Sequence, residues 1–276
     1  MILLISPLKA YATRRLLEEA RLMNAGIELV DADQLAKQNF KIDIAKFNAL
    51  FIRSAFPYFN ELKVLAQKLS LAKKYVVDNE FIASGFEVSK WHMYEQLKSA
   101  DLPMPKTFKL FELGFDSNFK KFPLVLKWQY GFGGKFVHLV RTKDQFKKIL
   151  AEYPKDQIIV QEYIEADFEY MVMIVGGKSL PKILKFQIKK PINGQPFNYD
   201  PYKFFVLNAE INKQVVEIAE KAAMATGKEL CKVDILQKGN KFYILEVNRC
   251  PSLLPFEPYT KLNVAKIYLD YINSRI

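Results

Sequence analysis

The chain has 276 residues, of which 50% are hydrophobic and 26% charged, which excludes a disordered tail and a disulfide-dense secreted scaffold. No apolar run approaches the ~20 residues that cross a bilayer, and no basic segment precedes the opening apolar stretch as in a signal peptide. Two cysteines, Cys231 and Cys250, form neither a disulfide framework nor a zinc-like cluster. These features predict a globular protein of the reducing cytoplasm, with no membrane partner.

The charge is strongly basic, because 41 basic and 30 acidic residues give a net charge of +11. Residues 171–276 hold most of the excess, with 16 basic and 9 acidic side chains. A basic surface can bind nucleic acid, but it can equally hold a nucleotide triphosphate or an acidic substrate. Composition therefore leaves these partners open.

Residues 1 to about 82 alternate apolar strands with helical patterns, which favours a small parallel α/β sheet. Gly26 follows the first helical pattern and is expected to end it as a left-handed cap. The predicted elements are strands at 2–5, 27–30, 49–52 and 75–77, with helices ending near 23 and covering 62–71.

The rest of the chain is richer in strands and indicates an α+β arrangement. Thr142 and Gln145 form a capping pattern before one of its helices. Gly176-Gly177 separates two β-rich runs and predicts a tight turn, not a phosphate loop, because Val172 stands where a Walker A glycine is needed. The expected strands are 106–110, 123–128, 136–140, 157–163, 169–175 and 180–189, followed by a hairpin over 230–247; the expected helices pass through Trp91 and cover 143–151, 209–226 and 261–274.

A buried strand, 122–127, ends in Lys127 and leads into a glycine-rich loop, 131–134. A lysine that faces a cleft supplies charge to a phosphate, and glycines let backbone N–H groups approach phosphate oxygens. The alternative is a lysine that reaches solvent before an ordinary hairpin. The strand sequence alone does not decide whether Lys127 binds phosphate or reaches solvent.

Asp234, Glu246 and Asn248 interrupt two apolar strands of the predicted hairpin. Burying a carboxylate costs several kcal/mol without a compensating cation or hydrogen bonds, and convergent side-chain oxygens suit magnesium. A two-residue turn at Gly239-Asn240 would place Asp234 opposite Leu245 and leave Glu246 on the other face. We therefore predict a shifted register, through an odd-length loop or a bulge, that turns the three polar side chains to one cleft beside Lys127. The alternative is a polar outer face on a half-exposed hairpin.

In this order, the features resemble the ATP-grasp superfamily, most closely its branch of ribosomal-protein glutamate ligases and lysine-biosynthesis ligases, over nearly the whole chain. The resemblance implies an N-terminal pre-ATP-grasp α/β domain over 1–82 and a two-lobed ATP-grasp fold over 83–276. The central lobe would cover about 83–163 and the C-terminal lobe about 164–276.

The resemblance also implies sites for ATP and for Mg²⁺, expected as two ions with Mn²⁺ as the alternative. Three positions depart from the family pattern: Trp128 replaces a proline, Phe136 a glycine and Met171 an arginine. The implied contacts are Lys90, Lys127, Gly131 and Gly134 for phosphates, Gln161, Glu162, Tyr163 and Ile164 for adenine, Glu169 for ribose, and Asp234, Glu246 and Asn248 for metal.

The implied activity is ATP-dependent ligation of a small-molecule or peptide carboxylate to an amine through an acyl phosphate. Lys185 and Arg249 are the expected catalytic contacts, and Arg53, Lys189 and Asn198 the expected substrate contacts. A solvated charged strand face is the alternative for the lysines of 178–190. Two other functions stay open, a basic nucleic-acid-binding protein and a catalytically silent ATP-binding protein on this fold, and so does a homo-oligomer.

Overall fold

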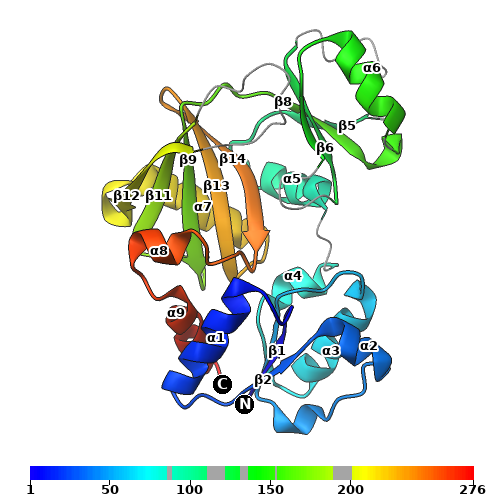
Figure 1. Cartoon of the computed structure of the whole chain (residues 1–276), viewed down its shortest axis with the longest axis vertical. Helices are drawn as coiled ribbons and strands as arrows, with labels where there is room; N and C mark the ends of the chain where they lie inside the picture. The colour runs from blue at the N-terminus through cyan, green and yellow to red at the C-terminus, as the bar shows by residue number, and fades with distance from the viewer. Residues whose placement is uncertain (86–88, 111–121, 131–135, 153, 189–200) are drawn as a thin grey trace.

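The computed structural model describes residues 1–85, 89–110, 122–130, 136–152, 154–188 and 201–276. Three sheets succeed one another along the described chain, and helices cover them (Figure 1). The predicted combination of an α/β part with an α+β part is confirmed.

The N-terminal sheet is parallel, with strand order β2-β1-β3-β4. Every residue of β1 and β3 is buried, as expected for a parallel sheet covered on both faces. Its elements are β1 (Ile2–Ile5), α1 (Tyr11–Leu22), β2 (Ile27–Val30), α2 (Ala32–Lys37), η1 (Ile44–Lys46), β3 (Ala49–Ile52), α3 (Phe59–Leu71), β4 (Tyr75–Val76) and α4 (Asn79–Ala83).

The end of α1 differs from its prediction. Asn24, not Gly26, adopts the left-handed conformation, with a φ of 51°. Asparagine tolerates this region better than most residues, so the left-handed position that follows the helix lies two residues earlier than predicted. Gly26 already belongs to the sheet edge, where its carbonyl accepts a hydrogen bond from the Ile2 N–H at 2.8 Å.

The central lobe contains an antiparallel sheet with strand order β5-β8-β6-β7. The predicted cap of α6 is confirmed, because Thr142 Oγ1 accepts a hydrogen bond from the Gln145 N–H at 3.2 Å. The elements of this lobe are α5 (Lys90–Ser99), β5 (Thr107–Lys109), β6 (Leu124–Trp128), β7 (Val137–Val140), α6 (Lys143–Glu152), η3 (Lys155–Gln157) and β8 (Ile158–Glu162).

The C-terminal lobe is built on a sheet with order β12-β11-β9-β13-β14, and β10 pairs with β9. Gly176 and Gly177, with φ of 58° and 79°, make the predicted tight turn between β9 and β10. The elements are β9 (Phe168–Val175), β10 (Lys178–Ser179), β11 (Lys182–Ile188), β12 (Pro201–Asn208), η4 (Ala209–Ile211), α7 (Lys213–Ala225), β13 (Leu230–Lys238), β14 (Lys241–Arg249), α8 (Phe256–Thr260) and α9 (Val264–Asn273).

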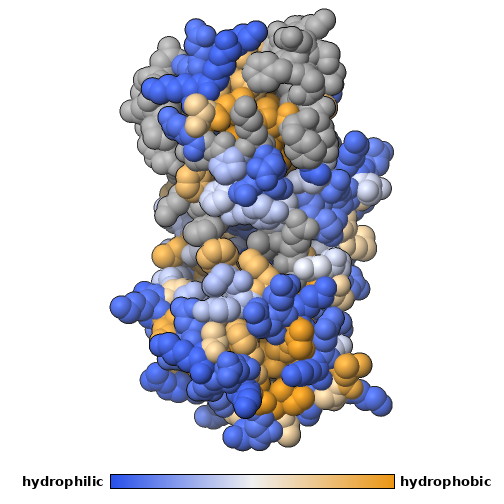
Figure 2. Space-filling model, turned by 90° about the vertical axis from the view of Figure 1, so that its right-hand side faces the viewer, coloured by the Kyte–Doolittle hydropathy of each residue, from blue (hydrophilic) through white to orange (hydrophobic). Residues whose placement is uncertain are grey.

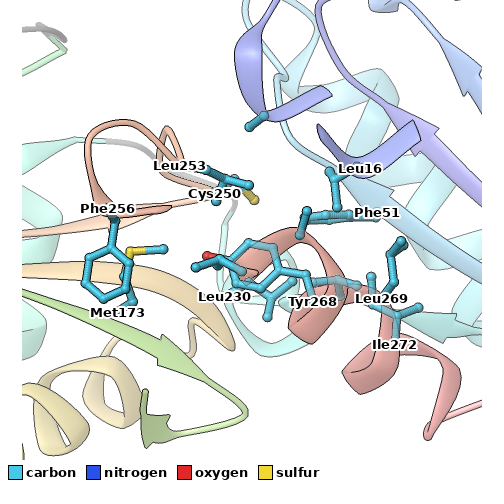
Figure 3. Packing of buried hydrophobic residues seen from close by; sticks show 14 of the residues in the cluster. Leu16, Phe51, Met173, Leu230, Cys250, Leu253, Phe256, Tyr268, Leu269 and Ile272 are labelled. Carbon is cyan, nitrogen blue, oxygen red and sulfur yellow. The ribbon is translucent and has the colours of Figure 1, made fainter. Parts of the chain in front are cut away.

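One hydrophobic core joins the N-terminal sheet to the C-terminal lobe (Figure 3). Leu16 of α1 and Phe51 of β3 belong to the same buried cluster as Met173 of β9 and Tyr268 of α9. Helix α9 lies beside α1, so the last helix of the chain packs on the first (Figure 1). Because this core is shared, we expect these two parts to unfold together.

Hydrophilic side chains cover much of the face shown in Figure 2 and leave separate hydrophobic patches between them. Such a mixture is ordinary for a folded protein surface. None of the helices in the described ranges combines the length and the apolar character needed to cross a membrane.

Candidate active site

The hairpin β13–β14 adopts the shifted register that the metal hypothesis required. The turn keeps two residues, with Lys238 opposite Lys241 and Gly239 at a φ of 56°. The register then shifts at Leu245, so that Asp234 lies opposite Glu246. Leu245 is therefore the extra residue of a bulge, and the predicted shift is confirmed.

Directly opposed residues point to the same face of a sheet. Asp234, Glu246 and Asn248 therefore share one face of the hairpin, which we call the cleft face. Asn248 Nδ2 donates a hydrogen bond to Asp234 Oδ2 at 3.0 Å, whereas the buried Asp234 Oδ1 has no hydrogen-bond partner in the described part of the chain. The opposite face packs on α7, through residues such as Val233 and Val247.

Lys90 reaches this hairpin from the central lobe. Its Nζ donates to Glu246 Oε1 at 3.0 Å, and its side chain is 15% exposed. The residue opens α5, whose first N–H groups are capped by the Ser89 hydroxyl. A cation in the first turn opposes the helix dipole, so this position is not explained by helix stability.

Lys127 lies near the end of β6, is 8% exposed, and lines one cleft together with Lys90, Gln161 and Glu246. Burial lowers the pKa of the Lys127 ammonium to about 8, and the charge of nearby Glu246 opposes that shift. The lysine thus faces the acidic residues of the other lobe, as predicted, instead of reaching solvent.

Three acidic groups share the electrostatics of the cleft face. Burial, and after it the charge of Asp234, raise the pKa of Glu169 to about 8. Burial also raises the pKa of Asp234 against the opposing effect of Lys232. For Glu246, burial acts in the same direction, but Lys90 and the other lysines outweigh it and lower the pKa. Burial therefore favours the protonated form of all three carboxyl groups, and the nearby cations favour the ionised form.

Sequence reasoning missed Lys232. Its Nζ lies 2.8 Å from Asp234 Oδ2, and it pairs across the hairpin with Asn248. Burial lowers its pKa, but Asp234 outweighs this effect and the net shift is upward. Strand alternation could have found it, because a residue two positions before Asp234 must share its face.

The predicted adenine segment lies at the end of β8. The Glu162 N–H donates to the Lys106 carbonyl at 2.8 Å, and the Ile164 carbonyl accepts from the Ala166 N–H at 2.9 Å. The Gln161 amide donates to Thr107 Oγ1 and is buried. Tyr163 is half-buried between them. Their contacts with adenine and that of Glu169 with ribose remain predictions.

The unusual residues Trp128 and Phe136 contact each other. Phe136 has a φ of 61°, a left-handed backbone that favours glycine, and its ring meets Trp128 edge to face at 4.9 Å. The Trp128 indole also donates to Gln157 Oε1 at 2.6 Å. This contact gives Phe136 a packing role in a conformation that otherwise suits glycine.

The prediction that Lys185 contacts phosphate beside these residues is wrong. Lys185 pairs with Tyr170, which pairs with Ile235 on the α7 face, so its side chain leaves the sheet on the side opposite Asp234. Its Nζ lies 3.8 Å from the centre of the Phe168 ring. Cation–π attraction to the rings, not a phosphate, explains its position.

Arg249 and Arg53 lie at the junction with the N-terminal sheet. The Arg249 Nε lies 2.6 Å from Asp78 Oδ2, on the opposite face from Asn248, so the expected catalytic contact is not at the cleft face. Arg53 Nη2 donates to the Cys250 and Pro251 carbonyls at 3.0 and 2.9 Å. Gly131, Gly134, Lys189 and Asn198 lie outside the described residues.

Comparison with known proteins identifies the same fold. The model of the RimK-like ATP-grasp domain matches residues 114–272. A protein named probable alpha-L-glutamate ligase from Marinomonas sp. (strain MWYL1) is 23% identical over 289 residues, covering 96% of this chain and 92% of that protein. A protein of the same name from Haemophilus ducreyi is 24% identical over 208 residues, covering 73% and 67%.

Solved structures agree over the whole length. The RimK domain ATP-grasp protein of Sphaerobacter thermophilus has a TM-score of 0.67 at 18% identity, with 99% of each chain covered. The ATP-grasp ligase PsnB, in complex with a phosphomimetic variant of its minimal precursor, Mg and ADP, has a TM-score of 0.72 at 13% identity, covering 99% and 98%. The family match spans more than half of the chain, and the chain belongs to the RimK-like ATP-grasp family.

Proposed function

We propose that this protein is an ATP-dependent carboxylate–amine ligase that forms an amide or peptide bond through an acyl phosphate and releases ADP and phosphate. The observation that carries the proposal is the convergence of Lys90 and Lys127 on the carboxylate of Glu246, which lies opposite Asp234 in the hairpin. The relatives named as probable alpha-L-glutamate ligases and the ATP-grasp ligase PsnB, solved with a variant of its minimal precursor, support this class of reaction.

Phosphoryl transfer asks a protein mainly for positioning and charge neutralisation. We assign Lys90 and Lys127 to the phosphates of ATP, and the chain segment 161–164 to adenine. The substrate carboxylate would attack the γ-phosphate, and an amine would then displace phosphate from the acyl group. No side chain has to act as a covalent nucleophile in this scheme.

Asp234, Glu246 and Asn248 fit a magnesium ion. The buried, unpartnered Asp234 Oδ1 needs a cation or a donor, and Asn248 can offer its carbonyl oxygen because its Nδ2 faces Asp234. No group of three or more His, Cys, Asp or Glu side chains forms a metal cluster within the described ranges, and Mg²⁺ needs only one or two carboxylates beside phosphate and water. Bound there, the ion would neutralise phosphate charge.

Arg53 remains our candidate for the substrate carboxylate. Its Nε and Nη1 atoms are buried without a hydrogen-bond partner in the described part of the chain, and only Nη2 is engaged by backbone carbonyls. Lys189 and Asn198 remain further substrate candidates. Arg249 becomes a positioning residue of the junction. The two cysteines are free and buried, which fits the expected reducing cytoplasm.

Mg-ATP is expected to stabilise the fold. A ligand that binds only the native state adds about 2.7 kcal/mol at a hundredfold excess over Kd, which a thermal-shift measurement resolves. Lys127→Ala should reduce the shift strongly, whereas Lys178→Ala, on an exposed pair with Glu220, and Lys185→Ala, on the α7 face, should not. No shift for the folded protein would contradict the ATP assignment.

The reaction itself is tested by ADP release over a panel of carboxylates and amines. A ligase releases ADP only when both substrates are present, whereas a silent ATP-binding protein releases none. A nucleic-acid-binding protein would instead show affinity for nucleic acid that falls steeply with salt, through counterion release. Steep salt dependence without ADP release would favour that alternative.

ATP affinity is expected to fall as the pH rises above 8. Burial lowers the pKa of Lys127 to about 8, so the free protein holds this ammonium charged below pH 8 and neutral above it. Above this pKa, each further pH unit lowers the protonated fraction of the free lysine by about tenfold, so it should weaken binding by about tenfold, or about 1.4 kcal/mol. Calorimetric titration of Mg-ATP between pH 7 and 9.5 measures this slope.

Glu169 titrates in the same range and gains negative charge as the pH rises. The pH dependence of ATP affinity therefore has one contribution from Lys127 and one from Glu169. Glu169→Gln should keep the contribution of Lys127, and Lys127→Met should remove it. Equal slopes in the wild type and in Lys127→Met would contradict this assignment.

A further inference from the structure

We propose that Lys232 is a tethered cation of the phosphate site and that the site consequently takes one divalent ion, not two. This inference rests on the proposed function and concerns the metal content of the same site. The family resemblance led us to expect two ions, and no motif in the sequence had singled out Lys232. Its position on the cleft face changes that expectation.

The backbone fixes where Lys232 points. It lies two residues before Asp234 on β13 and directly opposite Asn248 on β14, so all three side chains leave the sheet on the cleft face. The neighbouring strand β9 places Met173 beside Lys232 and Met171 beside Asp234. Among the described residues, these apolar neighbours on β9 offer the ammonium no acceptor, and Asp234, at 2.8 Å, is its main counter-charge.

The oxygens of Asp234 are divided between two tasks. Oδ2 accepts both the Lys232 ammonium at 2.8 Å and the Asn248 amide at 3.0 Å, whereas Oδ1 is buried and has no hydrogen-bond partner among the described residues. The side chains of Lys232 and Asp234 are only 20% and 6% exposed, so solvent screens the attraction between their charges only weakly. Of the two Asp234 oxygens, only Oδ1 is therefore left to ligate a metal ion together with Glu246 and Asn248.

Charge leads to the same conclusion. The acidic groups of this face are Asp234, Glu246 and Glu169, and the cations that act on them are Lys90, Lys127 and Lys232. Lys90 and Lys127 face the cleft from the central lobe and are assigned to phosphates. Lys232 remains paired with the carboxylates. Its ammonium neutralises negative charge that a second metal ion would otherwise neutralise, and it repels a second divalent ion nearby.

The test counts bound Mn²⁺ by electron paramagnetic resonance, with a non-hydrolysable imido analogue of ATP equimolar to the protein. The wild type should hold one Mn²⁺ per chain, and Lys232→Met should hold two. Lys232→Arg keeps the charge and should hold one. Lys238→Met, at the exposed end of the same strand, should also hold one.

Folding is followed in parallel by circular dichroism, and Lys232→Gln serves as the second neutral variant if Lys232→Met does not fold. Two equally tight Mn²⁺ ions in the wild type, or one ion in the neutral variants, would overturn the inference and leave the ligase proposal intact. Failure of the analogue to bind any of these proteins would overturn the proposed function and this inference with it.

Discussion

Asp78→Asn is expected to lower the free energy of unfolding by about 3–5 kcal/mol, because it strips a buried arginine of its carboxylate partner. Asp78 is 0% exposed and its Oδ2 lies 2.6 Å from Arg249 Nε. Its Oδ1 accepts the N–H groups of Glu229 and Leu230 at 2.6 and 3.2 Å. One side chain thus ties the end of β4 to the start of β13.

Asparagine is the right replacement because Asp78 has a φ of 60°, which asparagine tolerates and alanine does not. Urea denaturation measures the change. Asp270→Asn, which removes an exposed pair with Lys266 on α9, is the control and should cost only about 0.3–0.5 kcal/mol.

A double variant separates the charge from the packing. Asp78→Asn combined with Arg249→Met removes both charges, and it should cost clearly less than the sum of the single changes. Additive costs, or a loss below about 1 kcal/mol for Asp78→Asn alone, would show that the pair does not hold the junction.

The site could be predicted from sequence where alternation along strands decided it. Glu246 and Asn248 had to share a face, and a metal site then required a register shift relative to Asp234. The sequence placed that shift in the region of Gly239-Asn240, where flexible residues suggested it. The structure places it at Leu245, because the two-residue turn closes regularly and the bulge follows the pair Ile235–Ile244.

Lys185 was predicted wrongly because a lysine-rich strand does not reveal which lysine faces the cleft. The neighbouring strand decides it: Leu184 lies opposite Met171, which lies opposite Asp234, so Lys185 must point the other way. Pairing between strands distant in sequence is not visible in a single chain. The packing of α7 on that face is also a tertiary contact, which a single sequence does not reveal.

The join between the N-terminal sheet and the C-terminal lobe was also beyond the sequence. The resemblance predicted a separate α/β domain, but it did not predict that Tyr268 of α9 would pack against Phe51 of β3. Local periodicity identifies an apolar face and not its partner. Burial of Asp78 at this junction follows from the same long-range packing.

Glu246→Gln is expected to weaken the binding of magnesium at the ATP site by at least ~100-fold while leaving the fold intact. The Glu246 side chain is 33% exposed, and it receives the Lys90 ammonium at 3.0 Å. The amide keeps the shape but removes the charge that we assign to the metal ion. Loss of a partner that only supports a ligand costs about 10–100-fold in metal affinity, so loss of the ligand charge itself should cost at least ~100-fold.

Glu220→Gln is the matched control, because it makes the same change in a carboxylate that lies outside the cleft. Glu220 pairs there with Lys178, at a distance of 3.1 Å. Titration of Mg²⁺ at constant ATP, followed by thermal shift, should require at least ~100-fold more metal for Glu246→Gln and no more for Glu220→Gln. Freed from Glu246, Lys90 can still meet a phosphate, so some metal-independent ATP binding should remain. A variant that responds to Mg²⁺ like the wild type would contradict the assignment of Glu246 to the metal and would remove the main support for the ligase mechanism.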